Sequence, residues 1–131
     1  MKGYTVNIEE AAKANEHFRT VLYTSAYMQL VLMSIPEGGE IPKEVHGQDQ
    51  FIRVEAGMGT ATLAGVAHTL SAGFAIIVPA GTEHTILNSS STQALKLHTL
   101  YSPPHHADGV VHETIAIAEA AHEEFLGDTT E

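Results

Sequence analysis

The chain has 131 residues and a formal net charge of −10, a length that fits one domain with a single core. It contains no cysteine, which excludes disulfides, thiolate nucleophiles, zinc fingers and iron–sulfur clusters. Only six Lys and Arg residues are scattered among 16 acids, which argues against nucleic acid and anionic membranes as partners. Apolar runs are too short to span a bilayer, so we expect a cytoplasmic protein.

The N-terminal residues predict a short helix over about 7–15, because Asn7 is a suitable N-cap and Glu10 follows three residues later. From residue 17 onward, short runs of β-branched, aromatic and aliphatic residues alternate with Gly, Pro and Ser turn signals. The expected strands are 18–25, 26–35, 50–55, 59–64, 66–70, 75–79, 84–88 and 94–101. Many short strands without helices between them predict a sandwich or barrel over about 17–102.

The C-terminal part predicts a loop followed by a helix. Pro103 and Pro104 end the last strand, and residues 105–113 are expected to form an ordered loop. Residues 114–126 have helical apolar spacing, with Gly127 placed to end the helix. The segment from residue 108 onward holds seven acids and no Lys or Arg, so it carries −7 of the net charge. We therefore expect most of the charge on a solvated surface, in one domain spanning 1–131.

Two segments carry His and oxygen-bearing side chains at fixed spacings between glycines. The first holds Gly38, Glu44, His46, Gln50 and Gly57; the second holds Gly73, Pro79, Gly81, His84 and Asn88. Together they resemble the two cupin motifs, over roughly residues 27–102. The second motif matches at every fixed position, whereas the first keeps the spacing but reads Glu-x-His-x3-Gln. The resemblance implies an all-β cupin jelly-roll barrel with a short N-terminal helix and a C-terminal helix.

The resemblance also implies a metal site, because cupins turn three His and one Glu onto one ion. Carried over by position, the ligands are Glu44, His46, Gln50 and His84. Their summed charge is −1, as in a cupin site, since the acid stands at position 44 and an amide stands at its usual place. Strand alternation supports this arrangement independently, because Glu44 and His46 are two residues apart and so face the same side.

The same alternation divides the strands around the site. Ile52 and Val54 follow Gln50 inward, while Phe51, Arg53 and Glu55 face away. Ile86 and Asn88 likewise share the face of His84.

The type of ligand narrows the choice of metal. Two imidazoles, one carboxylate and one amide oxygen suit Mn²⁺ or Fe²⁺ and tolerate Ni²⁺, Co²⁺ or Zn²⁺. Four protein ligands leave an octahedral ion two positions for a carboxylate, diol, enediol or keto acid.

The other histidines give weaker signals. His17, His68 and His122 are expected on the surface, and alternation places His98 outward with Lys96. His105, His106 and His112 follow the last strand, either as solvent-facing loop residues or as a lid or proton shuttle. Beyond the ligands themselves, the residues that could line the site or its lid are His98, His106 and Tyr101.

These signals favour a small metalloenzyme that binds an oxygen-rich small metabolite, of the dioxygenase, decarboxylase or lyase type. A non-catalytic metal- or metabolite-binding module is one alternative. A sugar-binding cupin like mannose-6-phosphate isomerase is another, although few basic residues are available to hold a phosphate. A barrel that has lost its metal and serves only for assembly is a third. Exposed aliphatic residues on an outer sheet face predict a homodimer.

Overall fold

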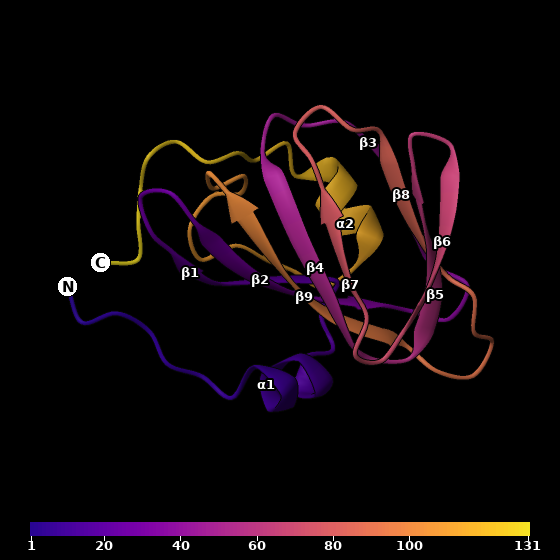
Figure 1. The fold of residues 1–131 in the computed structure, drawn as a ribbon. Helices are drawn as coiled ribbons and strands as arrows, with labels where there is room; N and C mark the ends of the chain where they lie inside the picture. Colours follow the sequence, from indigo (N-terminus) through magenta and orange to yellow (C-terminus); the bar gives the residue numbers. More distant parts are fainter.

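The computed structural model describes all 131 residues as two antiparallel sheets that face each other, with a short helix near each end of the chain (Figure 1). The strand order is β10-β1-β2-β9-β4-β7 in the six-stranded sheet and β3-β8-β5-β6 in the four-stranded sheet. In chain order the elements are α1 Ile8–Ala14, β1 Arg19–Thr24, β2 Gln29–Ile35, β3 Glu40–Glu44, β4 Asp49–Ala56, β5 Met58–Leu63, β6 Val66–Ser71, β7 Ala75–Val78, β8 His84–Asn88, β9 Leu95–Ser102, β10 Val111–His112 and α2 Ile115–Ala120. The expected all-β architecture is confirmed.

The core lies between the sheets and is built from alternate residues of their strands. Ile52 and Val54 of β4 meet Ile86 of β8 there, and all three are almost fully buried. Burying such aliphatic side chains contributes about 1.5–3 kcal/mol each, which is why the alternation of apolar residues selects one register. The prediction that these residues follow Gln50 and His84 inward is confirmed.

Two strands lie outside the expected set, and both are edge strands. In β3 only Ile41 is buried, and Pro42 interrupts the ladder with β8, so its residues show no alternating pattern. The two-residue β10 lies inside the segment expected to be a loop and pairs with the first residues of β1. Short edge strands with one buried residue carry too little periodicity to be recognised from sequence.

The first helix forms as expected, with the Asn7 side chain accepting a hydrogen bond from the Glu10 amide. It packs on the outer face of the six-stranded sheet, where Ala12 is fully buried against β2, β4 and β9. Neither helix of the fold has the length and apolar character needed to cross a membrane.

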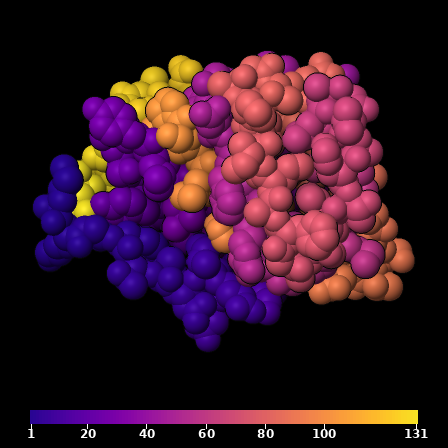
Figure 2. All heavy atoms as spheres, in the orientation of Figure 1, coloured from indigo at the N-terminus to yellow at the C-terminus, as the bar shows by residue number.

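The second helix is shorter than expected and ends at Ala120, seven residues before Gly127. Beyond it, residues 121–131 form a C-terminal strap that bonds to other parts of the chain instead of continuing the helix. The Phe125 amide donates to the His105 carbonyl, and the Thr130 amide donates to the Thr24 carbonyl. These tertiary hydrogen bonds replace helical ones, so the prediction of a helix to residue 126 is wrong. Figure 2 shows the yellow C-terminal segment and the indigo N-terminal segment on the same side of the molecule.

Candidate metal centre

Two of the predicted ligands face each other across a strand pair. Glu44 is the last residue of β3, His84 is the first of β8, and the two are directly paired in the ladder. His46 lies two residues past Glu44, in the connection to β4. One ligand atom from each of these three side chains lies within 4.8 Å of the other two, and His84 Nε2 is 3.9 Å from Glu44 Oε2. The structure therefore brings three of the four predicted ligands together as potential metal donors.

Backbone carbonyls orient both imidazoles. His84 Nδ1 lies 2.8 Å from the carbonyl of Thr82, and His46 Nδ1 lies 3.1 Å from the carbonyl of Gln48. A carbonyl oxygen only accepts, so each Nδ1 donates and each neutral ring keeps its lone pair on Nε2. This arrangement, in which the second ring nitrogen is held by a hydrogen bond, is typical of metal-ligating histidines.

Gln50 completes the predicted set from the opposite sheet. Its side chain is buried on β4, where Nε2 donates to Thr99 Oγ1 at 2.9 Å. Its Oε1 is 3.1 Å from His46 Nε2. Because His46 donates from Nδ1, its Nε2 and the Gln50 Oε1 are both hydrogen-bond acceptors. Two acceptors this close repel each other, and a cation bound between them removes the repulsion. The donor set thus fits a divalent ion held by Glu44, His46, Gln50 and His84.

The turn of the second motif fastens the two motif segments together. The Gly81 amide donates to the His46 carbonyl at 2.9 Å, and Gly81 has φ of +80°, which favours glycine. The Ala80 amide donates to Asp49 Oδ1 at 2.8 Å. Asn88, the last motif residue, is buried and binds backbone groups around residues 35 and 93, so its role is to anchor the chain.

Aromatic rings from the end of β9 and from the loop after it extend the cluster. The His105 ring is centred 4.8 Å from that of His46 and 4.6 Å from that of His106. The Tyr101 ring lies 5.7 Å from that of His46 and 5.2 Å from each loop histidine. Tyr101 and His106 were predicted to lie near the site. For His105 the sequence left open a solvent-facing position or a lid, and the residue is half-buried beside His46.

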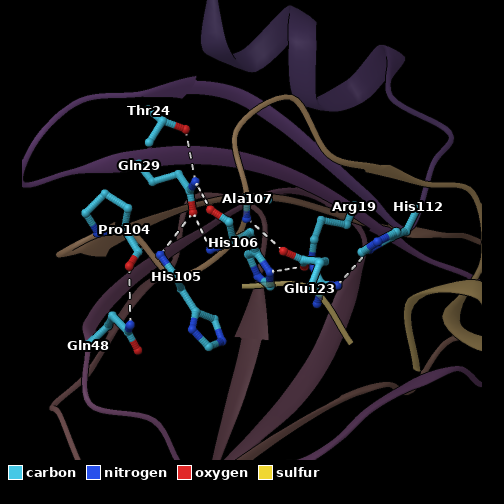
Figure 3. Close-up of polar contacts among 10 residues, drawn as sticks. All are labelled: Arg19, Thr24, Gln29, Gln48, Pro104, His105, His106, Ala107, His112 and Glu123. Carbon is cyan, nitrogen blue, oxygen red and sulfur yellow. Dashed lines mark hydrogen bonds and ion pairs between the residues drawn. The ribbon is translucent and has the colours of Figure 1, made fainter. Parts of the chain in front are cut away.

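The solvent-facing interpretation of this loop is wrong, because His106 and His112 are also buried. A buried amide, Gln29 on β2, holds the loop in place (Figure 3). Its Oε1 accepts from the backbone amides of His105 and His106, at 3.2 and 2.9 Å, and its Nε2 donates to the His106 carbonyl.

The strap fixes the same loop from the other side. Glu123 accepts from His106 Nδ1 and from the Ala107 amide, each at 2.7 Å (Figure 3). Burial raises the pKa of the Glu123 carboxyl, but these hydrogen bonds outweigh burial and lower the pKa to about 2. Burial lowers the pKa of His106, and burial together with the neighbouring histidines lowers the pKa of His105 to about 3. The loop therefore presents neutral imidazoles at neutral pH.

His98 does not reach the site. It lies on the outer face of β9, where its Nδ1 is 3.1 Å from Glu55 Oε1, and Glu55 also pairs with Arg53. Burial lowers the pKa of His98. Thr99 and Tyr101, which are two residues apart on β9, face inward. The alternation that predicted His98 to face outward is therefore confirmed, and the prediction that His98 could line the metal site is wrong. The three remaining histidines, His17, His68 and His122, are exposed as expected.

Comparison with known proteins decides the family. A family model described as the cupin domain matches residues 31–101. The chain belongs to the cupin family. This cupin is 42% identical over 127 residues to the uncharacterized protein YrkC of Bacillus subtilis, covering 92% of this chain and 68% of YrkC. An uncharacterized protein of Acanthamoeba polyphaga mimivirus is 44% identical over 113 residues, covering 82% of this chain and 70% of that protein.

Solved structures show the same fold. The crystal structure of BH2720 from Bacillus halodurans is similar with a TM-score of 0.89 at 41% identity, covering 92% of this chain and 96% of that chain. KdgF from Halomonas sp. has a TM-score of 0.61 at 23% identity, covering 65% of this chain and 76% of that chain. At that identity, the likeness to KdgF shows the fold of the barrel alone.

Proposed function

We propose that this cupin binds one divalent metal ion through Glu44, His46, Gln50 and His84, and that it is a small metalloenzyme. The observation that carries the proposal is the convergence of Glu44, His46 and His84 ligand atoms within 4.8 Å of one another. Backbone hydrogen bonds at both Nδ1 atoms, which leave the Nε2 lone pairs free, support it further. Two oxygen donors and two imidazoles favour Mn²⁺ or Fe²⁺, with Ni²⁺, Co²⁺ or Zn²⁺ as alternatives.

The proposed substrate is an oxygen-rich small metabolite, in a reaction of the dioxygenase, decarboxylase or lyase type. A bound ion with open positions supplies Lewis-acid polarisation or oxygen activation. The chain's own contribution is a partly enclosed site, in which Tyr101 and His105 pack beside His46 and limit access of water.

A sugar-phosphate substrate has less support. Of the four bases that could hold a phosphate, Lys43 pairs with Glu83, and Arg53 pairs with Glu55 on the outer sheet face. Lys96 donates to the Asn15 carbonyl at the end of α1. Arg19 lines a pocket with Glu44 and forms no ion pair with a carboxylate.

Metal content tests the proposal directly. Elemental analysis of untagged protein should find stoichiometric divalent metal in the wild type and little in His46→Ala or His84→Ala. The exposed His17→Ala and His68→Ala variants are matched controls and should keep the metal. A wild type that holds no more metal than the His46→Ala/His84→Ala double variant would contradict the proposal.

Turnover is tested separately from metal binding. Oxygen uptake by the Fe²⁺-loaded protein, with a panel of keto acids, diols and catechols, should reveal activity that His46→Ala lacks. Because decarboxylases and lyases take up no oxygen, chromatography should also follow the loss of each compound. A metal-loaded protein that is silent in both measurements favours the non-catalytic binding module.

We also propose that the cupin forms a homodimer through the edge of its six-stranded sheet. Phe74, just before the edge strand β7, and Ile77, within it, are 54% and 57% exposed. Light scattering after gel filtration should give the dimer mass for the wild type and for His68→Ala, and the monomer mass for Ile77→Lys. A monomeric wild type at high micromolar concentration would rule out this dimer. The cytoplasmic location stays a prediction.

A further inference from the structure

Arg19, the first residue of β1, is a buried cation with no carboxylate within ion-pair distance, although its charge helps to lower the pKa of Glu123. Only 7% of the residue is exposed, yet it takes part in none of the ion pairs of the chain. One guanidinium nitrogen donates to His112 Nδ1 at 3.0 Å, and the Nε atom is buried without any partner (Figure 3). A buried guanidinium that lacks an anion is unfavourable, because burial removes water from its charge without a countercharge to replace it. Arg19 is therefore poised to accept an anion.

A second unpartnered atom faces the same place. His106 donates from Nδ1 to Glu123, and its buried Nε2 has no hydrogen-bond partner. Arg19 and His106 both line one pocket of about 190 Å³, and Glu44 lines it as well. The pocket thus runs from an unpaired guanidinium to a proposed metal ligand. A larger pocket of about 530 Å³ contains none of the proposed ligands.

We propose that this pocket binds the carboxylate of a small organic acid, with Arg19 as the group that pairs with it and His106 Nε2 as a second polar contact. The proposal rests on the proposed function, since it places the rest of the acid toward the metal ligands. A guanidinium matches the planar carboxylate with two parallel hydrogen bonds. The small volume selects a short acid over a nucleotide or a polymer.

The other charges of the pocket favour a singly charged group over a phosphate. Its walls include Glu44, Glu119 and Glu123 beside the single cation Arg19. Glu123 is occupied by His106 and the Ala107 amide, and Glu44 belongs to the metal ligands. The remaining negative field would oppose the two charges of a phosphate at Arg19 more strongly than the one charge of a carboxylate. The second carboxylate of a dicarboxylic acid would lie toward the metal ligands.

Binding to the Zn²⁺-loaded protein tests the proposal, because Zn²⁺ also permits NMR. Calorimetry would compare succinate, its neutral analogue succinamide, and methyl phosphate, for the wild type, Arg19→Gln and the control Arg53→Gln. We expect succinate to bind the wild type and Arg53→Gln equally, and Arg19→Gln at least tenfold more weakly with unchanged metal content. Succinamide and methyl phosphate should bind more weakly than succinate.

Equal succinate affinity in Arg19→Gln, or tighter binding of succinamide or methyl phosphate, would overturn the carboxylate site. If Arg19→Gln does not fold, the Arg19 Nε–H resonance of the wild type carries the test. A shift on addition of succinate supports the proposal, and no shift overturns it. Failure of the metal site is distinguishable, since it would show as low metal content in the wild type before any acid is added.

Discussion

Among the four proposed ligands, the Gln50 amide is the weakest donor to a cation. It is neutral, and its oxygen is directed toward His46 Nε2 by the hydrogen bond from its own Nε2 to Thr99. Its backbone position on β4 is nevertheless buried and rigid, with Tyr101 and Val78 as its ladder partners. The strength of the metal site at this position is thus limited by the donor atom and not by its placement.

Replacing Gln50 with Glu should tighten metal binding, because a carboxylate of the same length would give the site a charge of −2. We expect Kd for Mn²⁺ to fall about tenfold, equivalent to about 1.4 kcal/mol. Gln50→Leu is the control that removes the donor and should weaken binding. Titration with a competing chelator measures both, and an unchanged Kd in the Glu variant would show that position 50 does not ligate.

At the residue scale, the convergence of Glu44, His46 and His84 could be predicted, and Tyr101 and His106 were expected near them, whereas the position of His105 could not be predicted. Glu44, His46 and His84 stand at spacings that alternation and turn residues make meaningful. His105 stands in a segment without periodicity, and its placement depends on a hydrogen bond that its backbone amide donates to Gln29, 76 residues away in the chain. Such long-range polar contacts leave no local pattern in the sequence from which they could be predicted.

Among the elements, the C-terminal strap has the largest effect on the shape of the site. It meets the histidine loop through Glu123 and Phe125, and it meets β1 through Thr130. The apolar spacing of residues 114–126 predicted a longer helix, because helical periodicity is a local signal and the competing contacts are distant. The strands that face the core on alternate residues were predicted well, because the alternation within each strand is a local signal and no distant contact competes with it.

Stability should depend on pH through Glu123. Its pKa is about 2 in the folded state against an ordinary value of 4.5, so its contribution is complete above pH 4.5 and is lost as the pH falls toward 2. Glu123→Gln should therefore cost about 2 kcal/mol at pH 7 and progressively less below pH 4.5. Urea unfolding across this range gives the difference between the two proteins. Glu124→Gln, at an exposed neighbour, should show no such trend, and a constant difference for Glu123→Gln would contradict the assignment.

In the whole molecule, the proposed metal position joins the two sheets. Glu44 and His84 belong to the four-stranded sheet, while Gln50 belongs to the six-stranded one. A bound ion would therefore crosslink the layers at the open end of the core, and its binding free energy would add to that of folding.

Removal of the metal should lower the thermal stability of the entire fold in one step. At an ion concentration about 100 times Kd, binding contributes about 2.7 kcal/mol, which corresponds to a Tm shift of about 5–10 °C for a domain of this size. Calorimetric scans before and after dialysis against EDTA measure the shift. His84→Ala should already melt at its own lower Tm and gain nothing from added Mn²⁺. If EDTA does not change the Tm of the metal-loaded wild type, the ion does not bridge the sheets.

The direct pairing of Glu44 with His84 in the β3–β8 ladder has an evolutionary consequence. Because the ligands converge from separate backbone positions onto one place, two substitutions that together move the acid from one position to another preserve both the number of donors and their total charge. Descendants of one barrel could exchange the identities of their ligands through such paired substitutions while keeping a metal site. Families of such barrels should then be grouped by the position in the fold where the donor atoms converge, more than by which residue types occupy the motif positions.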